Sequence, residues 1–168
     1  GGCRELKKVT KCIIVAPEYE AELLEKGSES EIGLDIMKKA NIFPKEYVFK
    51  HCKVDVVMKH NETIDVGGFK IRLIQVPGHS IGSSCYYLDL GDYKALFSSD
   101  IVFFGGTIGL GNWKGCSLRK YRENISRLAN LSIDGLYPGH YLWTIRNGQK
   151  HIDIAIENLT QYPWIPPM

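Results

Sequence analysis

Residues 69–80 read FKIRLIQVPGHS, and this stretch decides the fold. Its first part, Phe69 to Val76, alternates apolar and polar residues, which predicts a half-buried strand. The strand runs directly into Pro77-Gly78-His79-Ser80, where glycine lets the backbone turn sharply and lets the imidazole project into a cleft. A metal-competent side chain in a loop at the end of a strand is typical of a functional site.

Two further segments repeat this arrangement. Ser98-Ser99-Asp100 follows the predicted strand at residues 95–97, and Pro138-Gly139-His140 follows a short predicted strand at residues 134–137. A single His or Asp at such a place is more often an ordinary polar or turn residue. Two Pro-Gly-His tripeptides with a strand-end Asp between them are hard to obtain by accident, so we expect His79, Asp100 and His140 to share one site.

The remaining pattern alternates helices and strands. Three short helices are predicted in the first part of the chain, at residues 3–10, after Pro17, and around 32–40. Further strands are predicted at residues 12–16, 54–58 and 84–90, and further helices after the cap Ser117 and from Gly148 onward. His151, at the start of the last helix, is expected to face solvent. Mixed layers, with helices outside sheets, suit this order.

Bulk composition excludes several classes of protein. The 168 residues fit one domain, and the net charge of +2, without a run of like charges, gives no reason to expect nucleic acid or an anionic membrane as partner. No stretch approaches the ~18 apolar residues of a membrane span, and the start GGCRELKKVTK has no apolar core of a secretory signal. Five scattered cysteines favour a reducing, cytoplasmic setting.

The order of PGHS, a strand pair, SSD, a glycine-rich loop with a helix, and PGH resembles the metallo-β-lactamase superfamily, above all its glyoxalase II-like hydrolases. The resemblance covers nearly the whole chain. It implies an α+β fold, a four-layer αββα sandwich with a metal pair in a cleft at one edge. It also implies that His79 completes the first metal site, that Asp100 bridges both metals, and that His140 binds the second metal.

One part of the family pattern is missing. The family's first ligand motif, HxHxDH, does not occur in these 168 residues, and the chain begins at Gly1-Gly2, almost where that motif should just have ended. We therefore expect an N-terminally truncated version of the fold, one incomplete domain over residues 1–168, with half of the metal ligands absent.

The resemblance also implies a mechanism. A metal ion lowers the pKa of bound water to about 7, and the resulting hydroxide attacks a thioester, an ester or a similar small substrate. Zinc is the first choice, with one or two ions in the complete family, and iron or manganese would also suit imidazole and carboxylate ligands. Asp100 is the predicted catalytic residue, and Tyr141, Asn112 and Trp113 are predicted to line the substrate cleft.

Other functions stay open at this point. A chain that kept the fold without catalysis could act in binding, or form a homo-oligomer through an uncovered sheet edge. The same fold with iron could act on persulfides or in oxygen chemistry. A nucleic-acid-processing member is disfavoured, because the 40 residue steps from Asp100 to His140 leave no room for the inserted domain of that class.

Overall fold

The computed structural model describes residues 2–161, and these divide into two compact units. The first unit comprises residues 2–58 with 112–114, and the second comprises residues 59–111 with 115–161. Each unit has its own apolar core. The expected single domain over residues 1–168 stays a prediction, and it includes Gly1 and residues 162–168, which lie outside the described part of the chain.

The first unit pairs two short parallel strands with three short helices. Its elements are α1 (Cys3–Thr10), β1 (Val15–Pro17), α2 (Glu18–Lys26), α3 (Leu34–Lys39) and β2 (Val56–Met58). The strands pair in parallel, with Ala16 opposite Val57. The core of this unit is small and is formed by Ile14, Ala16, Ala21, Cys52 and Val54.

A carboxylate holds the first unit together where apolar burial is limited. Asp55 Oδ2 accepts a hydrogen bond from the backbone N–H of Ile14 at 2.9 Å and one from Lys7 Nζ at 2.5 Å. The hydrogen bond from Ile14, followed by the one from Lys7, lowers the pKa of Asp55 below its usual value. The residue just before β2 is thereby tied both to α1 and to the segment that leads into β1.

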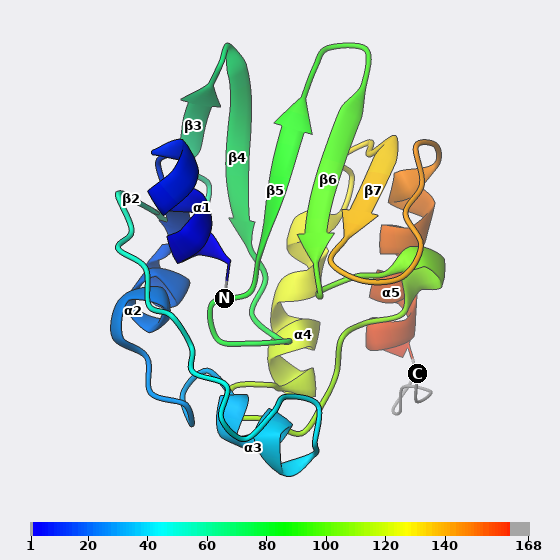
Figure 1. The fold of residues 1–168 in the computed structure, drawn as a ribbon. Helices are drawn as coiled ribbons and strands as arrows, with labels where there is room; N and C mark the ends of the chain where they lie inside the picture. Colours follow the sequence, from blue (N-terminus) through cyan, green and yellow to red (C-terminus); the bar gives the residue numbers. More distant parts are fainter. Residues whose placement is uncertain (1, 162–168) are drawn as a thin grey trace. The chain divides into compact units, whose positions relative to one another are not determined.

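The second unit is built on one mixed sheet of five strands in the order β3-β4-β5-β6-β7 (Figure 1). The strands are β3 (Thr63–Val66), β4 (Phe69–Gln75), β5 (Ser84–Asp89), β6 (Lys94–Ser99) and β7 (Gly135–Pro138). Neighbours from β3 to β6 pair antiparallel, as expected for hairpin-connected strands, whereas β6 and β7 pair in parallel. The parallel pair needs a long crossover.

Helices supply that crossover and cover the sheet. α4 (Leu118–Asn124) continues into a 3₁₀ turn, η2 (Ile125–Leu128), before β7, and α5 (Gly148–Gln161) follows β7. Figure 1 shows α4 and α5 behind strands β5 to β7. Their apolar faces and one face of the sheet form the main core, whose fully buried members include Leu96, Leu136, Tyr121, Ile152 and Leu159.

Most predicted elements of the second unit are present close to their expected bounds. The alternating stretch at residues 69–76 forms β4, and Ser117 caps α4, with its hydroxyl accepting from Lys120 N–H at 3.3 Å. The strand predicted at residues 95–97 is longer in the structure, where β6 comprises Lys94–Ser99. The strand β3 was not predicted. No helix within residues 2–161 is long and apolar enough to cross a membrane.

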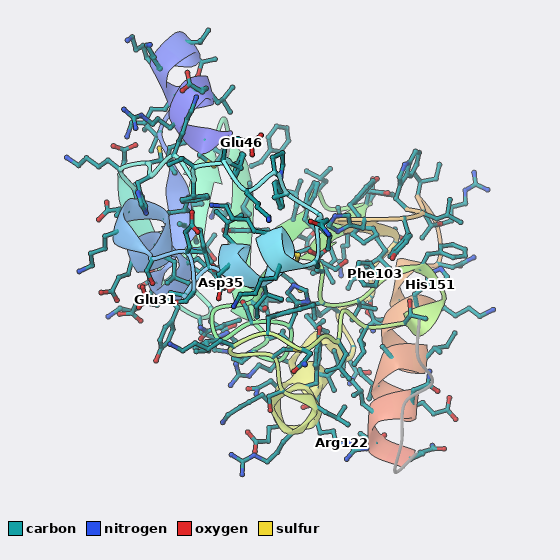
Figure 2. All side chains as sticks on the ribbon, turned by 60° about the horizontal axis from the view of Figure 1, so that its bottom comes forward. Glu31, Asp35, Glu46, Phe103, Arg122 and His151 are labelled. Carbon is teal, nitrogen blue, oxygen red and sulfur yellow. The ribbon has the colours of Figure 1, made fainter. Side chains whose placement is uncertain are left out.

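The expectation for His151 was wrong. This side chain is buried, with 9% of the residue exposed, and lies at the N-terminal end of α5 beside the segment that carries Phe103 (Figure 2). Its Nδ1 accepts a hydrogen bond from Gly105 N–H at 3.0 Å, and its ring lies 4.2 Å from that of Phe104. A polar residue in the first turn of a helix usually has its side chain exposed to solvent, which was the reason for the prediction. Here the 3₁₀ turn η1 (Phe104–Gly106) covers it instead.

We expect the protein to lose stability between neutral and mildly acidic pH, in part through His151. Burial, followed by the nearby charge of Lys150, lowers the pKa of His151 below the 6.5 of an exposed imidazole. The unfolded chain therefore binds the proton more readily, so this contribution is complete above pH ~6.5 and declines as the pH falls below it. Denaturant unfolding at several pH values measures the slope.

The variant His151→Gln should flatten that slope. Part of the slope should remain in His151→Gln, because burial also lowers the pKa of His60. Equal pH slopes for the wild type and His151→Gln would contradict the assignment.

Candidate metal centre

Three strand ends of the second unit bring the predicted ligands together. His79 follows β4, Asp100 follows β6 and His140 follows β7. The carboxylate of Asp100 lies between the two imidazoles: Oδ2 is 3.9 Å from His79 Nε2, and Oδ1 is 2.6 Å from His140 Nδ1. The structure thus brings these three side chains near one another, and their roles as metal ligands stay predictions.

The end of β6 is shaped by a strained turn. Ser99 has a left-handed backbone, with φ of 51°, which is uncommon for a residue other than glycine. The Ser98 hydroxyl donates to the carbonyl of Val102 at 2.7 Å and closes the turn. Gly139 N–H donates to the carbonyl of Ser99 at 2.7 Å, which ties the end of β7 to the end of β6. These bonds fix Asp100 and His140 relative to each other.

The chain after Asp100 forms a short hairpin that returns to the site. Val102 pairs with Ile108, and Phe103 N–H donates to the carbonyl of Thr107 at 2.8 Å. This returns Gly109 so close to Asp100 that a Cβ on Gly109 would lie 2.1 Å from the carbonyl oxygen of Asp100. Only glycine fits there without a shift of the backbone.

Backbone and carboxylate partners define the protonated nitrogen of each imidazole. His79 Nδ1 lies 2.8 Å from the carbonyl oxygen of Gly109, and a carbonyl can only accept, so Nδ1 carries the hydrogen. The lone pair of the neutral ring is then on Nε2, the nitrogen that faces Asp100. In His140 the hydrogen is on Nδ1, which donates to the Asp100 carboxylate.

A buried tyrosine that the sequence did not single out lies beneath these residues. Tyr121 of α4 is fully buried, and its hydroxyl lies 3.0 Å from the carbonyl oxygen of Gly109 and 3.3 Å from that of Asp100. Burial raises the pKa of Tyr121, so its hydroxyl keeps the proton with which it donates. Only its spacing as an apolar member of the helix face was visible in the sequence.

The site agrees with a divalent metal in its donor types and falls short of a complete ligand set. Two imidazoles and a carboxylate suit zinc, iron or manganese. Two ligand atoms on one tetrahedral zinc lie roughly 3.4 Å apart, so the 3.9 Å between His79 Nε2 and Asp100 Oδ2 is close to what a shared ion needs. Within residues 2–161, however, no three His, Cys, Asp or Glu side chains are placed to hold one ion.

The predicted substrate-lining residues fall in different units. Tyr141 belongs to the second unit, is 75% exposed, and lies next to the site, its ring 6.4 Å from that of His140 and edge-on to Phe103 at 5.3 Å. Asn112 and Trp113 belong to the first unit. Their predicted roles, like that of Tyr141, stay predictions.

A family model, "Metallo-beta-lactamase superfamily", matches residues 1–140. The chain belongs to the metallo-β-lactamase superfamily. The α+β fold predicted from the resemblance is thereby confirmed, as is the likeness to glyoxalase II, since curated relatives include several proteins named hydroxyacylglutathione hydrolase.

Two relatives illustrate the extent of the similarity. A hydroxyacylglutathione hydrolase of Rhizobium meliloti is 30% identical over 118 residues, which are 70% of this chain and 44% of that protein. A Bacillus velezensis protein named "Probable polyketide biosynthesis zinc-dependent hydrolase BaeB" is 36% identical over 116 residues, 67% of this chain and 48% of that one. The chain thus spans about half the length of the curated relatives it matches.

Solved structures agree on the fold. The subclass B3 metallo-β-lactamase BJP-1 of Bradyrhizobium japonicum superposes with a TM-score of 0.65 at 22% identity, covering 92% of this chain and 63% of that one. A β-lactamase from Chitinophaga pinensis gives a TM-score of 0.64 at 19% identity, covering 96% and 65%. At such identities the likeness concerns the fold alone.

We expect Gly109→Ala to disrupt the site and to lower stability. The new Cβ would lie 2.1 Å from the carbonyl oxygen of Asp100 and 2.7 Å from His79 Nδ1, so the hairpin must move away from both. Forced overpacking of this kind costs about 1–3 kcal/mol of unfolding free energy. Denaturant unfolding measures the loss.

Gly2→Ala is the matched control, because a Cβ at Gly2 meets nothing within 4 Å and its φ of −82° is open to alanine. Its unfolding free energy should stay within about 0.5 kcal/mol of the wild type. A Gly109→Ala protein as stable as Gly2→Ala would show that the hairpin does not need the close approach.

Proposed function

We propose that this chain carries part of the active site of a metal-dependent hydrolase that acts on thioesters, esters or similar small substrates, with zinc as the first candidate metal. The observation that carries the proposal is the convergence of His79, Asp100 and His140 from three strand ends, with the carboxylate between the imidazoles. Family membership and the hydrolases among the relatives support it, and one of these relatives is named as zinc-dependent.

In this proposal His79, Asp100 and His140 hold the metal. When bound, the metal activates water and polarises the carbonyl of the substrate. His79 offers Nε2 because its Nδ1 hydrogen is donated to Gly109. Asp100 is the proposed catalytic residue, and His140 Nδ1 donates a hydrogen bond to its carboxylate at 2.6 Å.

The candidate metal centre is accessible from solvent. His79 and Asp100 are each about a quarter exposed at the side chain, at 25% and 26%, and His140 is 68% exposed. Such a site is open to solvent and to a ligand that approaches from His140. Tyr141, beside His140, is the proposed contact for the substrate. The thioester of a hydroxyacylglutathione is the first substrate to test.

A reducing, cytoplasmic setting is proposed with this function. All five cysteines are free thiols, and Cys52 and Cys85 are buried. Burial raises the pKa of Cys85, which keeps that thiol protonated and unreactive.

A second candidate function, association with another copy of the chain, is supported by a row of aromatic side chains on the sheet. Phe97 lies on β6, between two other strands, yet is 45% exposed. Its ring stacks on that of Tyr137, with centroids 5.2 Å apart, and the Tyr137 ring stacks on that of Trp143 at 6.2 Å. Trp143 is 64% exposed. Exposed contiguous apolar surface is typical of interaction sites.

We expect the purified 168-residue chain to bind close to one zinc ion, measured by equilibrium dialysis and elemental analysis. His79→Ala, Asp100→Ala and His140→Ala should each weaken binding at least about tenfold, because each removes a proposed ligand of an already incomplete set. We expect the zinc-loaded chain to cleave the thioester of a hydroxyacylglutathione, and we expect Asp100→Ala to abolish this activity.

His51→Ala is the control for metal binding, since His51 belongs to the first unit and its ring is hydrogen-bonded to the carbonyl of Gly27. Zinc binding that survives all three ligand variants, or that His51→Ala lowers as strongly, would refute the proposed metal centre. Binding of iron in preference to zinc would favour the persulfide or oxygen chemistry of the same fold.

For the second candidate, we expect light scattering coupled to gel filtration to show a dimer at micromolar concentration. Trp143→Ser should shift the protein toward monomer, because it removes the most exposed ring of the aromatic row. The control Tyr19→Ser removes an exposed ring, 56% exposed, from the first unit and should leave the mass unchanged. A monomeric wild type would rule out this role.

A further inference from the structure

We propose that Tyr121 is a positioning residue that fixes the orientation and the ring tautomer of His79 through the carbonyl of Gly109. Its meaning for catalysis rests on the proposed function, in which His79 presents Nε2 to a metal.

One carbonyl oxygen connects the tyrosine to the imidazole. The carbonyl of Gly109 accepts from His79 Nδ1 at 2.8 Å and from the Tyr121 hydroxyl at 3.0 Å. A carbonyl oxygen has two lone pairs, so it can accept both bonds at once. Two donors on one acceptor fix the orientation of the Gly109 carbonyl. The orientation of the His79 ring is then also fixed, because its Nδ1 hydrogen points at this carbonyl.

The same hydroxyl also holds the other arm of the hairpin. It lies 3.3 Å from the carbonyl of Asp100 and 3.4 Å from that of Ile101, both longer than the contact with Gly109. A tyrosine has one hydroxyl hydrogen, so the shortest contact is the main hydrogen bond and the other two share the hydrogen weakly. The hydroxyl therefore lies where the start and the end of the hairpin meet.

The ring of Tyr121 supports the backbone that precedes His79. A Cβ on Gly78 would lie 2.4 Å from the ring carbon Cγ of Tyr121, so the backbone just before His79 rests directly on the ring. Ser117, the cap of α4, donates its N–H to the carbonyl of Gly78 at 2.8 Å. The loop carrying His79 is thus held by the first turn of α4, by the ring, and by the hydroxyl.

These contacts specify one tautomer. With its Nδ1 hydrogen donated to Gly109, the neutral ring of His79 has its lone pair on Nε2, and the opposite tautomer would place a lone pair against a carbonyl oxygen. If the hydroxyl is removed, the carbonyl of Gly109 is held by one donor in place of two. It can then rotate away from Nδ1, and both tautomers become accessible.

The test is Tyr121→Phe, which keeps the ring on Gly78 and removes only the hydroxyl. The 15N shifts of the His79 ring are measured on the metal-free, labelled 168-residue chain at a pH well above ~6.5, where imidazole is neutral. We expect the wild type to show the Nδ1–H tautomer and Tyr121→Phe to show a mixture. In zinc titrations the dissociation constant of Tyr121→Phe should rise about tenfold, the scale for a residue behind a ligand.

Tyr87→Phe is the matched control. It also removes a tyrosine hydroxyl, which lies 3.4 Å from Asp89 Oδ2 and 3.5 Å from the carbonyl oxygen of Leu131, and neither of these residues belongs to the candidate metal centre. A merely structural role for Tyr121 predicts that both variants lose stability while the His79 tautomer and zinc affinity stay at their wild-type values. That result would overturn the proposal.

The outcomes separate this inference from the proposed function. A tautomer change in Tyr121→Phe, in a chain that binds no zinc, would uphold the positioning role and refute the metal centre. If the wild type binds zinc, and Tyr121→Phe leaves both the His79 tautomer and the zinc affinity unchanged, the positioning role is refuted and the metal centre is upheld. Should Tyr121→Phe fail to fold, the wild-type spectrum decides, because an Nε2–H tautomer of His79 overturns the proposal by itself.

Discussion

The parallel pairing of β6 with β7 places Asp100 and His140 at the same end of one sheet. Carboxyl ends of parallel strands lie side by side, so residues that follow each strand become neighbours although they are far apart in the sequence. The register sets Phe97 opposite Tyr137 and, after an irregularity, Ser99 opposite Pro138. A shift of the register by one residue would turn the strand residues to opposite faces and separate the carboxylate from the imidazole.

This pairing depends in turn on the core beneath it. The crossover from β6 to β7 includes α4 and η2, and their buried residues Tyr121, Ile125 and Leu128 are all fully enclosed. The same helix therefore does two things. Its apolar face holds the parallel strands against a common core, and the buried Tyr121 hydroxyl reaches the loops that carry the site.

Much of the second unit could be predicted from local patterns. Alternation identified β4, and the helical spacing after Ser117 identified α4, because periodicity reports which side of an element is buried. The three ligand residues could be found because each stands in a short motif after a strand. β3 could not be found in this way: its residues Thr63 to Val66 lie between two turns, and most are exposed.

Contacts between distant residues explain the rest of what was missed. Nothing in the sequence around His151 signals that Gly105 N–H will reach its ring, and nothing around Tyr121 signals that its hydroxyl will meet Gly109. Each contact appears only when two loops close on a helix. The sequence carried an indirect trace of both, the glycine-rich stretch after Asp100, but a glycine shows only that space is limited and not which side chain limits it.

The three glycines around the site show what the motif residues are for. Gly78 lies against the Tyr121 ring, Gly109 against the Asp100 carbonyl, and Gly139 against the Asp100 carboxylate, where a Cβ would lie 2.8 Å from Oδ1. At each position the missing side chain lets a backbone approach the group that must be held. The glycines of the two Pro-Gly-His tripeptides therefore serve close packing around the carboxylate and its support. For this reason the motif is a sequence signature of the whole arrangement and not of the imidazoles alone.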